Sequence, residues 1–444
     1  MERMGTTVTE QTAQMLTEPT ERTLTEQTAT PTGPTAATPT ARTAKPRSGF
    51  RSLAGLIGPA EVAGFLQHNL GKGAYRARLA PEVAADLFGW PQLNAALAEH
   101  RLTPPRLRLE RGGADVTRGL FKPRRTRRGP VLQDLDPAAL TAALRDGATL
   151  IVDAVNELSP SLQQLCAGLS AEFAAASQAN LYACWGETQG FDVHWDDHDV
   201  FVVQVDGCKQ WALYGPTETA PTRRGPGAEA SPPQTEPELV VLEPGDVLYL
   251  PRGHWHAAVG KGGPTLHLTI GLTRKTGSDL LHWLADEVLA EEVGRRDLPF
   301  EDGDAAIGER LAQLLSGLAA RDPQELARCY RRHVEAVTPQ RPTLSFPYIG
   351  EAETPLAPTT QLRLAQGPAR LLRSEDGVVL SWRGVEFTLS PALGPAVQRL
   401  IDGEALPVEA FQGAAPEAPD AQVQAFLREM LRRGAFVVSG KARA

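Results

Sequence analysis

The chain has 444 residues, of which 42% are hydrophobic and 22% are charged, a composition typical of about two to four soluble globular domains. Its formal net charge of −8 argues against a surface that coats nucleic acid throughout, although a local basic patch is compatible with it. The four cysteines form no CxxC pair, which indicates free thiols in a reducing compartment. No apolar run approaches the roughly 20 residues that cross a bilayer, and no secretory signal pattern opens the chain. We therefore expect a cytoplasmic protein without a membrane partner.

Residues 1–48 are rich in Thr, Pro, Ala and Glu and almost free of large apolar side chains. Such a segment buries too little surface to offset the entropy cost of ordering it, so we predict a disordered tail. Beyond this tail the composition is globular. The apolar spacing predicts a helix over 52–70, with Pro59 near its start, and one or two helices over 80–102, broken at Pro91.

The next segments alternate between strands, helices and one basic loop. A strand is predicted to end near Gly113, and the segment Gly119–Pro130 is predicted to be a basic loop. Residues 136–155 are typical of a helix followed by a buried strand. An amphipathic helix is predicted over 159–175, where Ser159 provides the opening cap.

Short strands then follow one another closely between residues 179 and 272. Turn sequences such as Asp206-Gly207 and Pro244-Gly245-Asp246 separate them. The predicted strands are Ala179–Trp185, Asp199–Val205, Lys209–Tyr214, Glu238–Leu242, Val247–Leu250, Ala257–Val259 and Thr265–Leu272. This pattern predicts a small antiparallel barrel or sandwich.

Helical periodicity returns over 278–337, and residues 338–374 are Pro-rich and irregular. Residues 377–389 are typical of a pair of strands, 390–403 of a capped helix, and 419–440 of a helix that leads into a short strand. The simplest interpretation of this last part is a small mixed domain of winged-helix type.

Two histidine-rich segments carry the candidate chemistry. The sequence HWDDH places His194, Asp196 and His198 on one face of an extended chain, with Asp197 on the other face. The sequence GHWH, about 60 residues later, adds His254 and His256 at the same spacing. Two His and one carboxylate are the ligand set of mononuclear non-haem iron sites that leave positions open for substrates. A surface His–Asp pair without metal is the alternative for HWDDH taken alone.

A basic residue, Lys209, follows His194 by fifteen positions and begins a predicted strand. A fixed cation there could hold the carboxylate of a ligand, whereas taken alone it could be an exposed lysine after a turn. Gln204, Trp195 and Trp211 are interpreted as packing or cleft-wall residues.

The chain also matches a known pattern of separated motifs in the right order. The string NLYxxxGxxQGFxxHxDxHDVFxxQxxGxKxW, then PGDxLYxPRGxxH, then LHLTIG, resembles the JmjC-type ribosomal oxygenases. These are Fe(II)- and 2-oxoglutarate-dependent protein hydroxylases of the cupin superfamily, and the resemblance covers residues 50–275 well. It implies an α+β fold whose core is a double-stranded β-helix, the cupin or JmjC jelly roll, preceded by N-terminal helices.

The resemblance also implies a division of the chain into domains. A JmjC/cupin catalytic domain is expected over 49–275, after the tail. A helical dimerisation domain is expected over 276–345. A linker and a winged-helix-like domain are expected over 346–444. These expectations include a homodimer.

Site residues follow from the resemblance position by position. The implied metal ligands are His194, Asp196 and His256, which makes His198 and His254 neighbours of the site. Lys209 matches the residue that pairs with the distal carboxylate of 2-oxoglutarate. The positions implied to line the same pocket are Asn180, Tyr182 and Thr265. For Tyr182, core packing with a satisfied hydrogen bond is the alternative.

The implied function is hydroxylation of a protein or peptide side chain, with 2-oxoglutarate converted to succinate and CO₂. The expected target is an Arg or His of a ribosomal protein, and no direct contact with nucleic acid is expected. One alternative is a hydroxylase of a peptide natural product, and another is a cupin enzyme that does not use 2-oxoglutarate. A third is a non-catalytic cupin-type module that binds ribosomal protein or RNA through the winged-helix-like domain and the basic loop Lys122–Arg128. That loop is otherwise an ordinary solvated turn.

Overall fold

The computed structural model describes residues 52–187, 189–222, 231–339, 341–346, 356–374, 377–416 and 418–439. All of them belong to one unit, Pro46–Ala444. The predicted tail, residues 1–48, lies outside the described residues. No helix among the described residues is long and apolar enough to cross a membrane.

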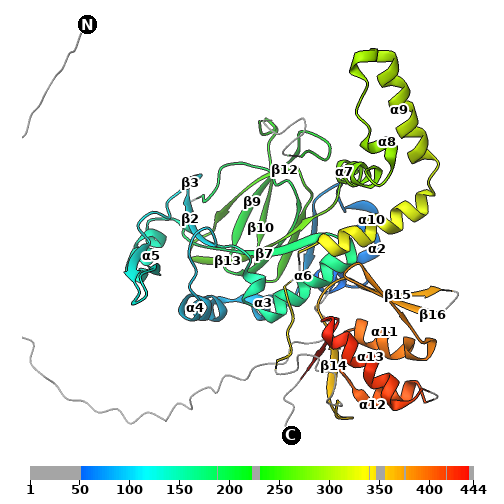
Figure 1. Cartoon of the computed structure of the whole chain (residues 1–444). Helices are drawn as coiled ribbons and strands as arrows, with labels where there is room; N and C mark the ends of the chain where they lie inside the picture. The colour runs from blue at the N-terminus through cyan, green and yellow to red at the C-terminus, as the bar shows by residue number, and fades with distance from the viewer. Residues whose placement is uncertain are drawn as a thin grey trace, which may run out of the picture. The chain divides into compact units, whose positions relative to one another are not determined.

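The centre of the molecule is a pair of antiparallel sheets (Figure 1). The larger sheet has the strand order β1-β11-β8-β13-β7-β6-β2-β3, and the smaller has the order β10-β9-β12. The bounds of the larger sheet's strands, in chain order, are Tyr75–Arg78, Leu107–Arg111, Ala114–Asp115, Thr149–Val152, Ala176–Trp185, Asp199–Asp206, Asp246–Leu250 and Pro264–Thr273. Strands β9, β10 and β12 span Lys209–Pro216, Glu238–Leu242 and His254–Gly260. The predicted antiparallel strands between 179 and 272 are thereby confirmed, and the arrangement is the jelly roll expected for a cupin.

Strand β8 illustrates how alternation builds the two faces of the larger sheet. Val200 and Val202 pack toward the smaller sheet, in a cluster that includes Trp211 of β9. Phe201 and Val203 point the other way and belong to the main core. Successive side chains of a strand point to opposite faces, so an apolar run buried on both sides is what a strand between two packed layers requires.

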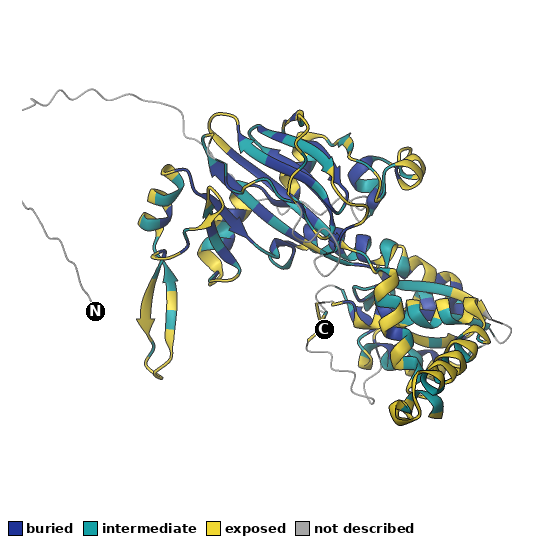
Figure 2. Ribbon diagram, turned by 90° about the horizontal axis from the view of Figure 1, so that it is seen from above, coloured by how far each residue is buried: buried dark blue, intermediate teal, exposed yellow. Residues whose placement is uncertain are grey.

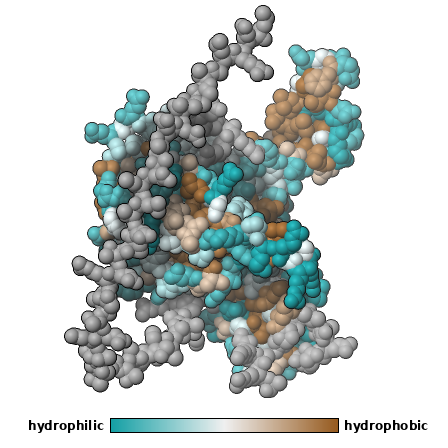
Figure 3. Space-filling model, turned by 90° about the vertical axis from the view of Figure 1, so that its left-hand side faces the viewer, coloured by the Kyte–Doolittle hydropathy of each residue, from teal (hydrophilic) through white to brown (hydrophobic). Residues whose placement is uncertain are grey.

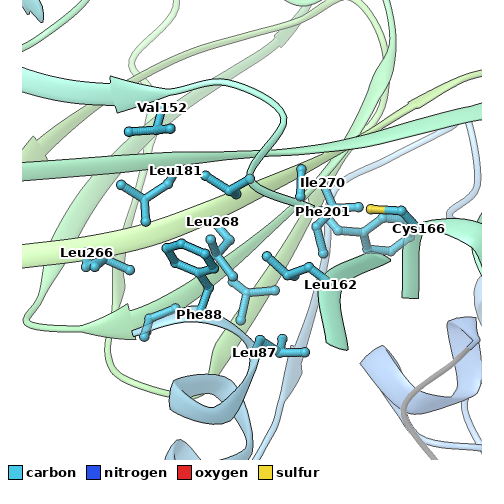
Figure 4. Close-up of a cluster of buried hydrophobic side chains, with 14 of the residues drawn as sticks. Leu87, Phe88, Val152, Leu162, Cys166, Leu181, Phe201, Leu266, Leu268 and Ile270 are labelled. Carbon is cyan, nitrogen blue, oxygen red and sulfur yellow. The ribbon is translucent and has the colours of Figure 1, made fainter. Parts of the chain in front are cut away.

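The main core lies between the larger sheet and helices that cover its outer face. Figure 4 shows Leu87 and Phe88 of α3 and Leu162 and Cys166 of α6 against side chains of β7, β8 and β13. Burial of each large apolar side chain contributes about 1.5–3 kcal/mol. This layer fixes the outer face of the sheet and leaves its inner face to form the site.

The N-terminal helices are α1 (Leu53–Ile57), α2 (Val62–His68), α3 (Pro81–Phe88), α4 (Trp90–Glu99), α5 (Pro137–Arg145) and α6 (Pro160–Phe173). The prediction of one continuous helix over 52–70 was wrong. Gly58 has φ +90°, a left-handed conformation that no α-helix continues through, and the chain restarts as α2. The Ser159 side chain accepts a hydrogen bond from the Leu162 N–H and caps α6, as predicted.

The basic segment predicted as a loop is partly a β-hairpin. Strand β4 (Phe121–Arg125) pairs with β5 (Val131–Leu135) in antiparallel register, and the pair forms a sheet of its own. The Thr126 N–H donates to the Pro130 carbonyl at 3.0 Å and closes the turn. The segment is so rich in charged residues that it shows no alternation of apolar and polar side chains, the pattern by which a strand is predicted. Figure 2 shows the hairpin as a projecting ribbon of mostly exposed residues.

Helices α7 (Gly277–Val288), α8 (Glu292–Arg295), α9 (Asp304–Ala319) and α10 (Pro323–Val337) follow the barrel. The last part has its own hydrophobic core and two three-stranded sheets, β18-β14-β19 and β15-β16-β17. Its strands β14 to β19 span Gln361–Leu364, Ala369–Ser374, Gly377–Trp382, Val385–Leu389, Leu406–Pro407 and Phe436–Val438. Its helices α11 to α13 span Gly394–Ile401, Val408–Ala414 and Asp420–Arg432. Its winged-helix character and the domain boundaries stay predictions.

Candidate metal and carboxylate site

Three candidate ligands meet at one end of the barrel: His194, Asp196 and His256. Their ligand atoms lie within 4.8 Å of one another, and no second group of this kind occurs in the part of the chain that the structure describes. A pair of backbone hydrogen bonds joins the two histidines. The His194 N–H donates to the His256 carbonyl at 3.1 Å, and the His256 N–H donates to the His194 carbonyl at 2.8 Å. Two segments far apart in the sequence are thus held together by the main chain.

Each imidazole of the group is oriented by a carbonyl oxygen. Nδ1 of His194 lies 2.8 Å from the Asp192 oxygen, and Nδ1 of His256 lies 2.9 Å from the His254 oxygen. A carbonyl only accepts, so both Nδ1 atoms must carry the proton, and both Nε2 atoms keep a lone pair. Burial lowers the pKa of His256, which favours the neutral ring that ligates a metal. The donor set therefore fits a divalent metal such as Fe(II).

The other candidates in HWDDH and GHWH lie apart from this group. Nδ1 of His198 lies 3.2 Å from Oδ1 of Asp197, and the His198 ring packs against Gly271, where a Cβ would be 2.8 Å from the ring. The expectation that His198 shares a face with His194 and Asp196 fails because residues 194–198 are not a strand, and β8 begins only at Asp199. His254 contributes its backbone carbonyl to the orientation of His256.

A cavity of about 220 Å³ inside the barrel contains the three candidate ligands and Lys209. Side chains from both sheets line it, including Val200 and Val202 of the larger sheet and Trp211 of the smaller. This cavity is the space in which a small substrate would meet the metal.

Lys209 is 6% exposed, and its amine makes no hydrogen bond or ion pair with any residue that the structure describes. Burial lowers its pKa. An unpaired buried cation costs free energy, which an anion in the cavity would offset. Nε1 of Trp211 and Nδ1 of His267 are likewise buried without a partner, and both residues line the same cavity. Two unsatisfied polar atoms and the amine of Lys209 around one cavity fit a ligand that carries a carboxylate.

Of the three other residues predicted to line the cosubstrate pocket, only Tyr182 lines the cavity. Tyr182 lines the cavity and stacks on His267, with ring centroids 4.9 Å apart, and burial raises its pKa. Oδ1 of Asn180 accepts hydrogen bonds from the Ala154 N–H and from Gln178. Thr265 is fully buried, with its hydroxyl 3.2 Å from Sγ of Cys184. Asn180 also forms a side-chain hydrogen bond with Tyr182, but neither Asn180 nor Thr265 lines the cavity itself. Their predicted place beside the cosubstrate stays a prediction.

Sequence reasoning missed several residues that line the cavity, among them Arg108, Phe191 and Thr269. It interpreted Trp211 as a packing or cleft-wall residue, and Trp211 does line the cavity. Trp211 lies two residues after Lys209 on β9, so strand alternation could have placed both side chains on the inner face. Arg108 lies on β2, and it reaches the cavity only because β2 pairs with β6 in the larger sheet. The sequence alone does not show that pairing.

A model of the JmjC domain matches residues 155–280. The chain is 30% identical over 262 residues to the bifunctional lysine-specific demethylase and histidyl-hydroxylase NO66 of Drosophila persimilis, covering 57% of this chain and 37% of that protein. It is 36% identical over 174 residues to human ribosomal oxygenase 1, covering 37% of this chain and 27% of the relative. The chain therefore spans about a third of the length of these curated relatives.

Among solved structures, the fold is similar to that of the Escherichia coli ribosomal oxygenase YcfD, with a TM-score of 0.53 and 18% identity. The match covers 85% of this chain and 98% of YcfD. A YcfD structure in complex with cobalt and 2-oxoglutarate matches with the same TM-score and identity. The sequence matches show that residues 155–280 resemble a JmjC domain, and the structural match shows that the chain is similar in fold to a ribosomal oxygenase.

Proposed function

We propose that this protein is an Fe(II)- and 2-oxoglutarate-dependent oxygenase that hydroxylates a protein or peptide side chain. The observation that carries the proposal is the cavity that holds both the His194–Asp196–His256 group and the unpaired cation of Lys209. A cupin that uses no carboxylate cosubstrate has no need for a buried, unpaired lysine there. The YcfD complex with cobalt and 2-oxoglutarate supports the same pair of ligands.

Each side chain then has a defined task. His194, Asp196 and His256 would hold the metal and leave positions free for the cosubstrate and O₂. Bound Fe(II) would supply the redox chemistry, in which 2-oxoglutarate, O₂ and a C–H group become succinate, CO₂ and a C–OH group. Lys209 would grip the distal carboxylate through a charge-assisted hydrogen bond, which is strong where water is excluded. Val200 and Val202 exclude that water.

The target that we propose is a His or Arg side chain of a ribosomal protein. The support comes from the names of the similar proteins, which are a histidyl-hydroxylase and ribosomal oxygenases. The first of these names also includes a lysine demethylase activity. Demethylation releases formaldehyde and removes a methyl group, whereas hydroxylation leaves one added oxygen atom on the target, so product analysis distinguishes them.

The test uses the full chain with Fe(II), ascorbate, 2-oxoglutarate and ribosomal proteins from a strain that lacks the gene. We expect succinate to form in proportion to target, and one ribosomal protein to gain the mass of one oxygen atom. Intact-mass spectrometry detects the product, and fragmentation locates the modified residue. Formaldehyde release without a gain of oxygen, or unchanged ribosomal proteins, would contradict the proposed target.

The partner that we propose for the helical segment is a second copy of the chain. Helix α9 has no buried residue, and Leu311 and Leu315, one turn apart on it, are 55% and 57% exposed. Phe300, just before this helix, is 72% exposed. Figure 3 shows hydrophobic side chains gathered on the α8–α9 part at the top of the view. An apolar surface of this kind is typical of an interface.

Changing Leu311→Glu and Leu315→Glu together is expected to halve the mass in solution, because two carboxylates per copy would be buried at the interface. Light scattering after size exclusion measures that mass. Leu239→Glu provides the control, since Leu239 lies on strand β10 and is 61% exposed. A monomeric mass for the unmodified protein at micromolar concentration would contradict the dimer.

A further inference from the structure

The β4–β5 hairpin concentrates positive charge in an acidic protein. Residues 116–133 hold six cationic and no acidic side chains, while the whole chain has a net charge of −8. The two strands pair only with each other. The cations therefore have no place in a core or between layers of the fold.

Ion pairs neutralise the base of this hairpin and leave its tip charged. Lys122 lies 2.6 Å from Asp136, and Arg124 pairs with Asp134. At the tip, Arg125, Arg127 and Arg128 are exposed, and none of them forms an ion pair with any of the residues the structure describes. The hairpin thus ends in three uncompensated positive charges.

The turn keeps these charges together. The Gly129 N–H donates to the Thr126 carbonyl at 3.1 Å, and Gly129 has φ +98°, so the chain reverses tightly around Arg127 and Arg128. Arg125 stands opposite Val131, which is 53% exposed. Like charges this close repel, and a two-stranded hairpin is only marginally stable by itself. A polyanion bound at the tip would relieve this repulsion.

We propose that the tip of the β4–β5 hairpin binds the phosphate backbone of RNA. All three tip cations are arginines, whose planar guanidinium groups bind phosphate through two hydrogen bonds and also stack on unpaired bases. A narrow projecting ribbon reaches into a groove or loop of RNA better than a flat surface does. The choice of RNA over DNA rests on the proposed function, because a ribosomal protein is presented on RNA. This proposal departs from the expectation of no direct nucleic-acid contact.

The test compares the full chain with the variant Arg125→Gln, Arg127→Gln, Arg128→Gln. Anisotropy of a fluorescein-labelled single-stranded RNA measures affinity between 50 and 200 mM salt, roughly the range in which phosphate contacts are lost. We expect the affinity of the variant to fall at least about tenfold, and its log–log salt slope to decrease by about 2, since three phosphate contacts are removed. The melting temperature should stay unchanged, because all three side chains are exposed.

The matched control replaces three exposed arginines outside the hairpin by Gln: Arg76, Arg145 and Arg328. It carries the same change in net charge and should retain the RNA affinity. The proposal is overturned if the unmodified chain does not bind RNA at about 50 mM salt, the lowest concentration of the titration, where phosphate contacts are strongest. It is also overturned if the salt slope decreases equally in both variants. The same holds if the hairpin variant keeps its affinity for RNA and loses affinity only for an acidic probe, a polyglutamate peptide. Because binding needs neither metal nor 2-oxoglutarate, this outcome is independent of whether the protein proves to be an oxygenase.

Discussion

Asp196→Ala is expected to abolish metal binding and 2-oxoglutarate turnover, with a loss of more than about 100-fold in each. Changes of residues that merely orient metal ligands already cost about 10–100-fold, and this change removes a ligand. It also removes the only carboxylate in the described His–Asp–His group, which holds the charge that complements a divalent ion. The absorption bands of added Co(II) report binding, and succinate formation reports turnover.

The chain supplies matched controls for this prediction. Asp197→Ala removes the adjacent carboxylate, which interacts with His198 and does not line the cavity. His254→Ala removes a ring but keeps the backbone carbonyl that orients His256. Both variants should bind Co(II) as the unmodified chain does. If Asp197→Ala lost the metal and Asp196→Ala retained it, the ligand assignment would be wrong.

The strands around the site could be predicted because their signals are local. Alternation along β8 and the turn residues Asp206-Gly207 are enough to mark two strands and the connection between them. The choice of the third ligand was different. Alternation favoured His198, and only the resemblance favoured His256. The bulge between Trp255 and His256 and the backbone bridge to residue 194 are pairings between distant segments, which no single segment encodes.

The lining of the cavity was predicted only in part, for the same reason. Lys209 stands out in the sequence because it follows a turn and matches a motif. The unpartnered atoms of Trp211 and His267 become visible only when two sheets face each other. The basic segment from Lys122 to Arg128 was interpreted as a loop, because exposed strands that pair only with each other carry no apolar alternation.

Lys209→Met is expected to raise the KM for 2-oxoglutarate by about 100-fold and to leave Co(II) affinity unchanged. Removing one member of a buried, hydrogen-bonded charge pair costs about 2–5 kcal/mol, and the carboxylate would lose its partner. Methionine fills a similar volume without charge. The exposed Lys261 offers a matched Lys→Met control that should keep the KM. An increase of less than about threefold in the KM of Lys209→Met would contradict the role of this lysine. Since about 1.4 kcal/mol corresponds to a tenfold change, a threefold change is only about 0.7 kcal/mol, well below the cost of a lost buried charge pair.

The depressed pKa of Lys209 adds a pH dependence with a definite sign. Only the protonated amine attracts a carboxylate, so the KM should rise with pH through the lowered pKa of Lys209, at a lower pH than an ordinary lysine, which titrates near about 10.4. This rise should be absent in Lys209→Met.

The stability of the ligand-free protein should increase with pH, whereas its affinity for 2-oxoglutarate decreases. Between the lowered pKa and the ordinary pKa, the unfolded chain binds more protons than the folded chain, so stability increases with pH in that window. Below the window the buried charge destabilises the fold, and Lys209→Met should raise the melting temperature by at least about 2 °C at a pH below the window. A variant that is more stable without ligand, yet fails to bind 2-oxoglutarate, would separate a binding lysine from a structural one. A structural lysine would lower the melting temperature when it is removed.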